Sequence, residues 1–175
     1  MANGSWGGTY FAHPFNNDNT DNSFRVNNSV KYQSANYSGF TFGGLYGFSN
    51  QAGGFGNNRA YSAGAQYANG PLKVAAAYLQ VQNGNSTTAT GGAVWTQSRF
   101  QLVGGDSTLR YNNYEVNGRY ALTPALALGA AYTYTDRKGM VPGDRNNDHA
   151  RYHQVGLQTD YALSKCTDIY AECVV

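Results

Sequence analysis

The amino-acid sequence predicts an all-β fold, a transmembrane antiparallel up-and-down β-barrel. Segments of about ten residues, in which apolar or aromatic residues alternate with polar or small ones, recur along most of the chain between Gly/Asn/Pro/Ser-rich turns. No apolar run approaches the ~18 residues of a transmembrane helix. Charged residues make up 13% of the chain, against ~25% in ordinary globular domains. A chain that spans a bilayer without such a run has to do so as a closed barrel of strands.

Residues 40–48 show the alternation most clearly. One face carries Phe40, Phe42, Gly44, Tyr46 and Phe48, and the other carries Thr41, Gly43, Leu45 and Gly47. Side chains on a strand alternate with period two. An aromatic-rich face opposite a small or polar one is typical of a sheet with lipid outside and water inside.

Along the chain, loop-like sequence comes first and strands follow. Residues 1–27 are expected to be a loop, because they contain an Asn/Asp-rich tract at 16–22 and a Pro at position 14. Alternation then predicts strands at 28–36, 40–49, 59–68, 72–82, 111–122, 126–137, 152–163 and 167–175. Short turns at 37–39, 69–71, 123–124 and 164–166 alternate with longer connections, the rhythm of short periplasmic turns and long external loops.

One stretch interrupts this rhythm. Residues 83–110 contain a single strand-like piece at 93–99, and one additional strand there would break the up-and-down order. Either this piece is part of a long loop, or a return strand expected between 82 and 93 is missing.

Aromatic side chains on the apolar face are expected to face lipid and to form interfacial girdles. The candidates are Tyr32, Phe40, Phe48, Tyr61, Tyr67, Tyr78, Tyr114, Tyr120, Tyr134 and Tyr161. Tyr is abundant, with 15 residues against 2 of Trp, so Tyr would supply most of these girdles.

The opposite face is expected to line water in the lumen of the barrel. The candidates are Lys31, Lys73, Glu115, Asn117, Arg119, Arg137, Gln158 and Asp160, with Asp168 and Glu172 on the same face. Fixed charges in a pore bias which ions enter. The alternative is that these side chains solvate a polar wall and have no part in selectivity.

Several other functions find no support in the sequence. The net charge is +2 without a Lys/Arg cluster, so nucleic acid is not an expected partner. No Gly-x-Ser-x-Gly sequence is present, and no catalytic residue or cofactor is expected. His149 and His153 are spaced as on a helix face, but on a strand they lie about 13 Å apart, so no metal site is expected. Cys166, in a turn, and Cys173, on the next strand, are expected to be unpaired thiols.

The order of several short motifs resembles the trimeric general porins of Gram-negative outer membranes. They are Trp-Gly-Gly-Thr-Tyr-Phe-Ala-His-Pro-Phe at 6–15, Asn-Asn-Ser-Val-Lys-Tyr at 27–32, and the segments 58–67, 70–74, 113–116, 122–126, 131–134, 153–157 and 160–165. The resemblance implies a sixteen-stranded barrel, a homotrimer in the outer membrane, contact with lipid and lipopolysaccharide, and passive diffusion of small hydrophilic solutes and ions. The chain departs from the family's pattern at Cys166, where an Arg is usual, and at Cys173, where a small residue is usual.

The resemblance also implies which part of such a barrel the chain supplies. Residues 1–175 would be one porin barrel domain that is incomplete at both ends, about half of the sixteen strands. Residues 1–27 would be the loop that follows the constriction loop, and residues 28–175 the strands. Because open sheet edges are not tolerated in lipid, the 175 residues alone are not expected to insert stably.

Two alternatives come from other classes of protein. The first is a complete small barrel of about eight strands that serves as an anchor or adhesin without a real pore; small barrels fill with interlocking side chains, whereas wide ones stay wet. The Gly, Ala, Ser, Asn and Gln of the inner face favour the wide barrel. The second is a hydrolase barrel, against which the absent nucleophile motif counts.

Overall fold

The computed structural model is all-β, as predicted, and describes residues 25–49, 52–55, 59–84, 94–95, 108–139 and 148–175. The main sheet has eight strands: β2 (Ser29–Gln33), β3 (Phe40–Gly47), β4 (Arg59–Asn69), β5 (Leu72–Gly84), β7 (Thr108–Ala121), β8 (Leu126–Gly139), β9 (Asp148–Ala162) and β10 (Asp168–Val174). A second, two-stranded sheet consists of β1 (Arg25–Val26) and β6 (Val94–Trp95). The described residues include no helix long and apolar enough to cross a membrane.

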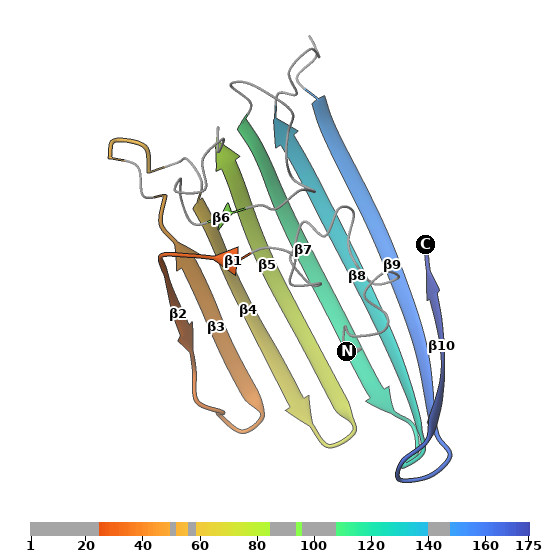
Figure 1. Ribbon diagram of the computed structural model, residues 1–175. Coiled ribbons are helices and arrows are strands. Elements are labelled where there is room, and N and C mark those ends of the chain that lie inside the picture. Colours follow the sequence, from red (N-terminus) through yellow and green to blue (C-terminus); the bar gives the residue numbers. More distant parts are fainter. Residues whose placement is uncertain (1–24, 50–51, 56–58, 85–93, 96–107, 140–147) are drawn as a thin grey trace.

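The main sheet is an antiparallel meander. Its strand order is β10-β9-β8-β7-β5-β4-β3-β2, so each strand pairs with the next strand of this sheet along the chain (Figure 1). All eight strands predicted from the alternation are present. β2 and β10 form the two edges, and within the described residues they do not pair with each other.

The two ends of the sheet differ in how their strands are connected. Short turns join β2 to β3, β4 to β5, β7 to β8 and β9 to β10, and all four lie at the same, lower end in Figure 1. The opposite end carries the longer connections, of which the longest leads from β5 to β7. We call these the turn end and the loop end.

Local hydrogen bonds explain why the chain reverses where it does. In the β7–β8 turn, the hydroxyl of Thr123 accepts hydrogen bonds from the backbone N–H groups of Ala125 and Leu126, at 3.2 and 2.9 Å. In the β9–β10 turn, the hydroxyl of Ser164 accepts one from the N–H of Cys166 at 3.2 Å. Ser and Thr hydroxyls stabilise turns in this way because they satisfy N–H groups that the sheet leaves free.

Within the described residues, no strand is missing from the main sheet at the interrupted stretch, and the rest of the strand-like piece at 93–99 beyond Val94–Trp95 lies outside them. β5 and β7 pair directly, from Leu72 opposite Tyr120 to Gly84 opposite Thr108. The expectation of a lost return strand is therefore wrong. Val94–Trp95 instead pairs with Arg25–Val26, so residues 25–26 are a short strand rather than part of the loop expected over 1–27.

The turn between β2 and β3 is a two-residue hairpin connection that requires glycine. Tyr37 and Phe40 exchange backbone hydrogen bonds of 2.8 and 3.0 Å, and the residues between them have positive φ, 53° at Ser38 and 95° at Gly39. Two positive φ angles are typical of a type I′ turn, which matches the twist of the flanking strands. A Cβ at Gly39 would lie 2.1 Å from the carbonyl oxygen of Ala68 on β4.

Gly39→Ala is therefore expected to destabilise the sheet more than Gly70→Ala, the matched change in the β4–β5 turn. Gly70 also has positive φ, 54°, but a Cβ there would meet no atom within 4 Å. Both changes place an alanine at a positive φ angle, which costs about 1–2 kcal/mol. Only Gly39→Ala adds a clash with the backbone, at the carbonyl oxygen of Ala68. Urea unfolding of the two variants measures the difference, and equal losses of stability would contradict it.

Candidate functional site

The register of the sheet sorts its side chains onto two faces. In an antiparallel pair, residues opposite each other project to the same face. Val116 lies opposite Ala76 and Tyr132, and Tyr132 lies opposite Val155, so these residues share one face. Asn117 lies opposite Ala75 and Ala131 on the other face. We call the first the apolar face and the second the polar face.

The register places nine of the ten girdle candidates on the apolar face. Phe48 lies one residue beyond β3, and its ring centroid is 5.0 Å from that of Tyr46. Near the loop end, a chain of rings with centroids 4.8–6.3 Å apart runs across six strands through Tyr46, Tyr61, Tyr78, Tyr114, Tyr134 and His153. We call this chain the aromatic row. Phe40, Tyr67, Tyr120 and Tyr161 lie toward the turn end of the same face.

Exposure on the two faces is the reverse of what a water-soluble protein shows. On the apolar face Val116 is 60% exposed and Leu157 is 55% exposed. On the polar face Thr133 is 3% exposed and Tyr111 is 5% exposed. A continuous exposed apolar surface across the sheet marks contact with another apolar phase.

The eight lumen candidates all lie on the polar face. Toward the turn end, Lys73 lies opposite Arg119, whose guanidinium donates a hydrogen bond to the Asp160 carboxylate with an N–O distance of 2.8 Å. The pair is partly exposed, with side-chain exposures of 45% and 25%. Asp160 therefore neutralises one of two adjacent cations, which would otherwise repel each other.

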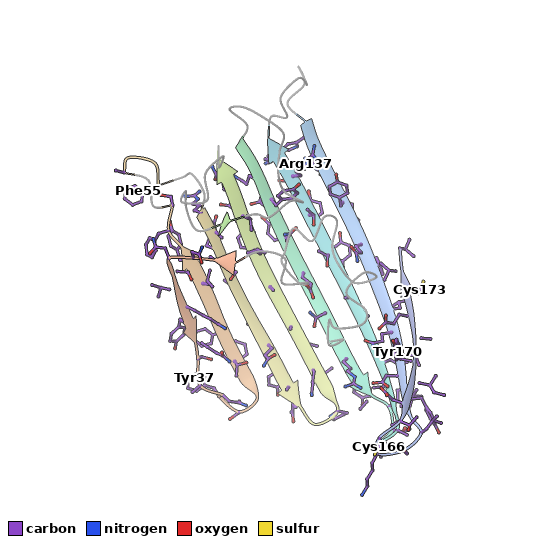
Figure 2. All side chains as sticks on the ribbon, viewed as in Figure 1. Tyr37, Phe55, Arg137, Cys166, Tyr170 and Cys173 are labelled. Atoms are coloured by element: carbon purple, nitrogen blue, oxygen red, sulfur yellow. The ribbon has the colours of Figure 1, made fainter. Side chains whose placement is uncertain are left out.

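The remaining candidates are distributed along the same face. The amide of Asn117 donates a hydrogen bond to the carboxylate of Glu115, two residues along β7. Gln158 lies opposite Gly129 on β8, next to the Arg119 position. Lys31 is on the edge strand β2, and Arg137 lies near the loop end (Figure 2). The structure thus brings Lys73, Arg119, Gln158 and Asp160 together, whereas Lys31 and Arg137 stand apart.

A buried polar cluster near the loop end of the polar face did not stand out in the sequence. Thr135 is 1% exposed and Asn113 is 3% exposed. The Thr135 hydroxyl donates a 2.7 Å hydrogen bond to the side-chain oxygen of Asn113, its direct cross-strand partner. Asn113 and Thr135 both fit the alternation of their strands. The sequence does not show, however, whether such polar side chains are buried against each other or exposed to water.

Thr135→Val is expected to lower the free energy of unfolding by about 1–3 kcal/mol. Valine has nearly the same shape as threonine but cannot donate a hydrogen bond to the buried Asn113 oxygen. A buried polar group without a hydrogen-bond partner lowers the free energy of unfolding by about this amount. Thr41→Val, on the same face but less buried, is the control. Urea unfolding measures both variants, and a Thr135→Val protein as stable as the control would contradict the expectation.

Histidine and cysteine form no reactive centre among the residues described. His149 and His153 both lie on the apolar face, and the Nδ1 atom of His153 is 2.7 Å from the Tyr132 hydroxyl oxygen. No group of three metal-ligating side chains occurs in the described part of the chain. Cys166 and Cys173 are free and exposed; Cys166 lies at the turn end and Cys173 along β10 (Figure 2).

Comparisons with known proteins agree with this geometry. A family model described as Gram-negative porin matches residues 1–174. An outer membrane porin protein of Bordetella pertussis is 39% identical over 95 residues, an alignment that covers 47% of this chain and 24% of that protein. The chain therefore matches about a quarter of the length of this curated relative.

Proposed function

Because the chain belongs to the Gram-negative porin family and is an outer-membrane porin, we propose that it forms part of the wall of a water-filled channel. Small hydrophilic solutes and ions pass through this channel by passive diffusion. Family and relative point to a channel protein rather than an enzyme.

The inverted exposure of the two faces carries the proposal. Lipid covers the exposed apolar face, including Val116 and Leu157, and two aromatic bands border it at either end. The polar face then borders the lumen, with Lys73, Arg119 and Asp160 facing water. Ions can pass along such a wall because water and fixed charges solvate them there, whereas lipid would not.

The open edges support a wide barrel over the small closed one. An eight-stranded barrel would pair its first strand with its last, but β2 and β10 remain at opposite edges of the described sheet. Unpaired backbone groups at these edges need partners in lipid. We propose that further strands complete a barrel of about sixteen, in which residues 1–175 form one incomplete domain. The small anchor or adhesin barrel is the less favoured candidate.

Assembly and surroundings are part of the same proposal. The complete barrel is a homotrimer in the outer membrane, and its apolar face contacts the bilayer and lipopolysaccharide. Short turns, including the one at Cys166, face the periplasm, and the loop end faces outward, as is typical of outer-membrane barrels.

Conductance across planar lipid bilayers tests the proposal. The complete porin that carries this chain is expected to insert in discrete steps, each made of three equal sublevels, with conductance proportional to bulk salt. Folded, heat-resistant protein that inserts without conducting would reject the channel and favour the anchor. Single steps without sublevels would reject the trimer alone.

A further inference from the structure

One tyrosine of the apolar face is hydrogen bonded to a histidine on the neighbouring strand. The hydroxyl oxygen of Tyr132, on β8, lies 2.7 Å from the Nδ1 atom of His153, on β9, and their ring centroids are 6.1 Å apart. Tyr132 lies opposite Val155, the next residue after His153 on the same face of β9. Its side chain therefore reaches from the middle of the apolar face toward the imidazole at which the aromatic row ends.

The direction of this hydrogen bond follows from the groups that form it. A phenol has one proton to donate, and a neutral imidazole whose own proton is on Nε2 has a lone pair on Nδ1 that accepts. The cross-strand neighbours of Tyr132 are Val116 and Val155, whose side chains offer no competing acceptor. The phenolic proton of Tyr132 thus points at a nitrogen base, in surroundings from which the proposed contact with lipid excludes most water.

Three other tyrosines of the apolar face have nearly the same exposure and serve as a comparison. Tyr114, Tyr120 and Tyr161 are 48%, 47% and 47% exposed, against 43% for Tyr132. Among these four described residues, only the Tyr132 hydroxyl is hydrogen bonded to an imidazole. A reagent that arrives through the surrounding phase meets the four rings about equally, so a difference in their reactivity points to the partner of the hydroxyl.

A base at the phenolic proton makes one-electron oxidation of a tyrosine easier. A phenol that loses only an electron becomes a radical cation, which is a very strong acid and is costly in an apolar phase. When the proton moves to a hydrogen-bonded base in the same step, the product is a neutral radical. The positive charge then rests on an imidazolium, a stable cation, in the aromatic row that borders the hydrocarbon.

We propose that Tyr132 is the preferred site of nitration of this sheet by nitrogen dioxide, with His153 as the acceptor of the phenolic proton. Nitrogen dioxide is a small uncharged radical that dissolves in hydrocarbon, so it reaches side chains that face lipid. The 2.7 Å hydrogen bond supplies the base, and the exposure of the ring supplies the access. This inference rests on the proposed contact of the apolar face with lipid.

Two molecules of nitrogen dioxide complete the reaction. The first takes one electron from Tyr132 and becomes nitrite, while the phenolic proton passes to Nδ1 of His153. The second forms a carbon–nitrogen bond with the ring carbon next to the one that carries the phenolic oxygen. The hydrogen on that ring carbon leaves as a proton, and the phenolic oxygen regains one. The products are 3-nitrotyrosine, nitrite and the proton that His153 accepted.

Nitration of the complete porin in vesicles of saturated phosphatidylcholine tests the inference. Nitrogen dioxide is generated by pulse radiolysis of nitrite, and mass spectrometry of proteolytic peptides measures 3-nitrotyrosine at each position. The unaltered protein is expected to carry several-fold more of it at Tyr132 than at Tyr114, Tyr120 or Tyr161. His153→Gln is expected to bring Tyr132 down to their level, because a glutamine amide accepts a hydrogen bond but is not a base.

His149→Gln is the matched control, because His149 also lies on the apolar face of β9 but is close to the Asp136 carboxylate, at 3.9 Å; it is expected to keep the preference. Equal nitration of the four tyrosines in the unaltered protein would overturn the inference, and this comparison decides even if His153→Gln fails to fold. A preference that survives His153→Gln, or an equal loss in His149→Gln, would also overturn it.

Conductance of the same preparations separates this inference from the proposed channel. A conducting protein without the preference for Tyr132 rejects only the role of Tyr132 and His153. A protein that is nitrated mainly at Tyr132 but does not conduct rejects only the channel.

Discussion

Val116→Arg is expected to lower the free energy of unfolding of the membrane-inserted porin by about 2–4 kcal/mol, the cost of an arginine near the bilayer midplane of an outer-membrane barrel. Val116 is 60% exposed on the apolar face, and its cross-strand neighbours are Ala76 and Tyr132. None of these neighbours offers a counter-charge, and the position lies between the two aromatic bands. A guanidinium there would have to distort the bilayer or draw water into it.

Asn117→Arg is the matched control, because residue 117 is the next position on β7 and projects from the other face. The same guanidinium there would face the lumen and cost little. Urea unfolding of the porin in lipid vesicles, followed by tryptophan fluorescence, compares both variants with the unaltered protein. If Asn117→Arg were the more destabilised of the two, the assignment of lipid and lumen faces would be reversed.

The sequence alone predicted the eight strands and their faces well, because both follow from a strict period of two. A one-residue error in phase would have moved residues such as Tyr78 and Glu115 to the wrong faces. Instead, the register of the sheet places nine of the ten girdle candidates on one face and all eight lumen candidates on the other. Whether the first set contacts lipid and the second lines the lumen stays a prediction, which the experiments test.

Strand ends at the loop end were predicted less well than those at the turn end. β7 begins at Thr108 rather than 111, and β9 begins at Asp148 rather than 152. On the apolar face these additions bring the polar residues Arg110, His149 and Arg151, so hydrophobic alternation disappears although the backbone ladder continues. Barrel strands extend past the hydrocarbon region, and there lipid no longer selects apolar side chains.

Contacts between distant parts of the chain could not be read from local patterns. Val94–Trp95 pairs with Arg25–Val26, some seventy positions earlier, and two residues are too few to show a period. The sequence also did not show that polar and charged side chains gather at the loop end of the apolar face. Arg110, Lys138 and Arg151 occupy positions whose parity assigns them to lipid, and only the register shows that these exceptions are neighbours.

Reversing the charges of Lys73 and Arg119 is expected to raise the permeability of potassium relative to chloride several-fold in dilute salt. The two cations are direct cross-strand neighbours on the polar face, and Asp160 neutralises only one of them. Glutamate at both positions, together with Asp160, would turn a site of excess positive charge into one of negative charge. Fixed charges along a pore attract the ion of opposite sign and repel the other.

The salt dependence of this effect separates electrostatics from a change of shape. The Debye length is about 30 Å at 0.01 M and about 3 Å at 1 M ionic strength, so the altered preference is expected to be large in 10 mM KCl and nearly absent in 1 M KCl. Lys73→Gln with Arg119→Gln, which neutralises without reversing, is expected to give about half the shift. Reversal potentials across a KCl gradient measure all three proteins. A shift of equal size at both salt concentrations would mean that the substitutions act through the width of the pore, and no shift at all would place Lys73 and Arg119 away from the ion path.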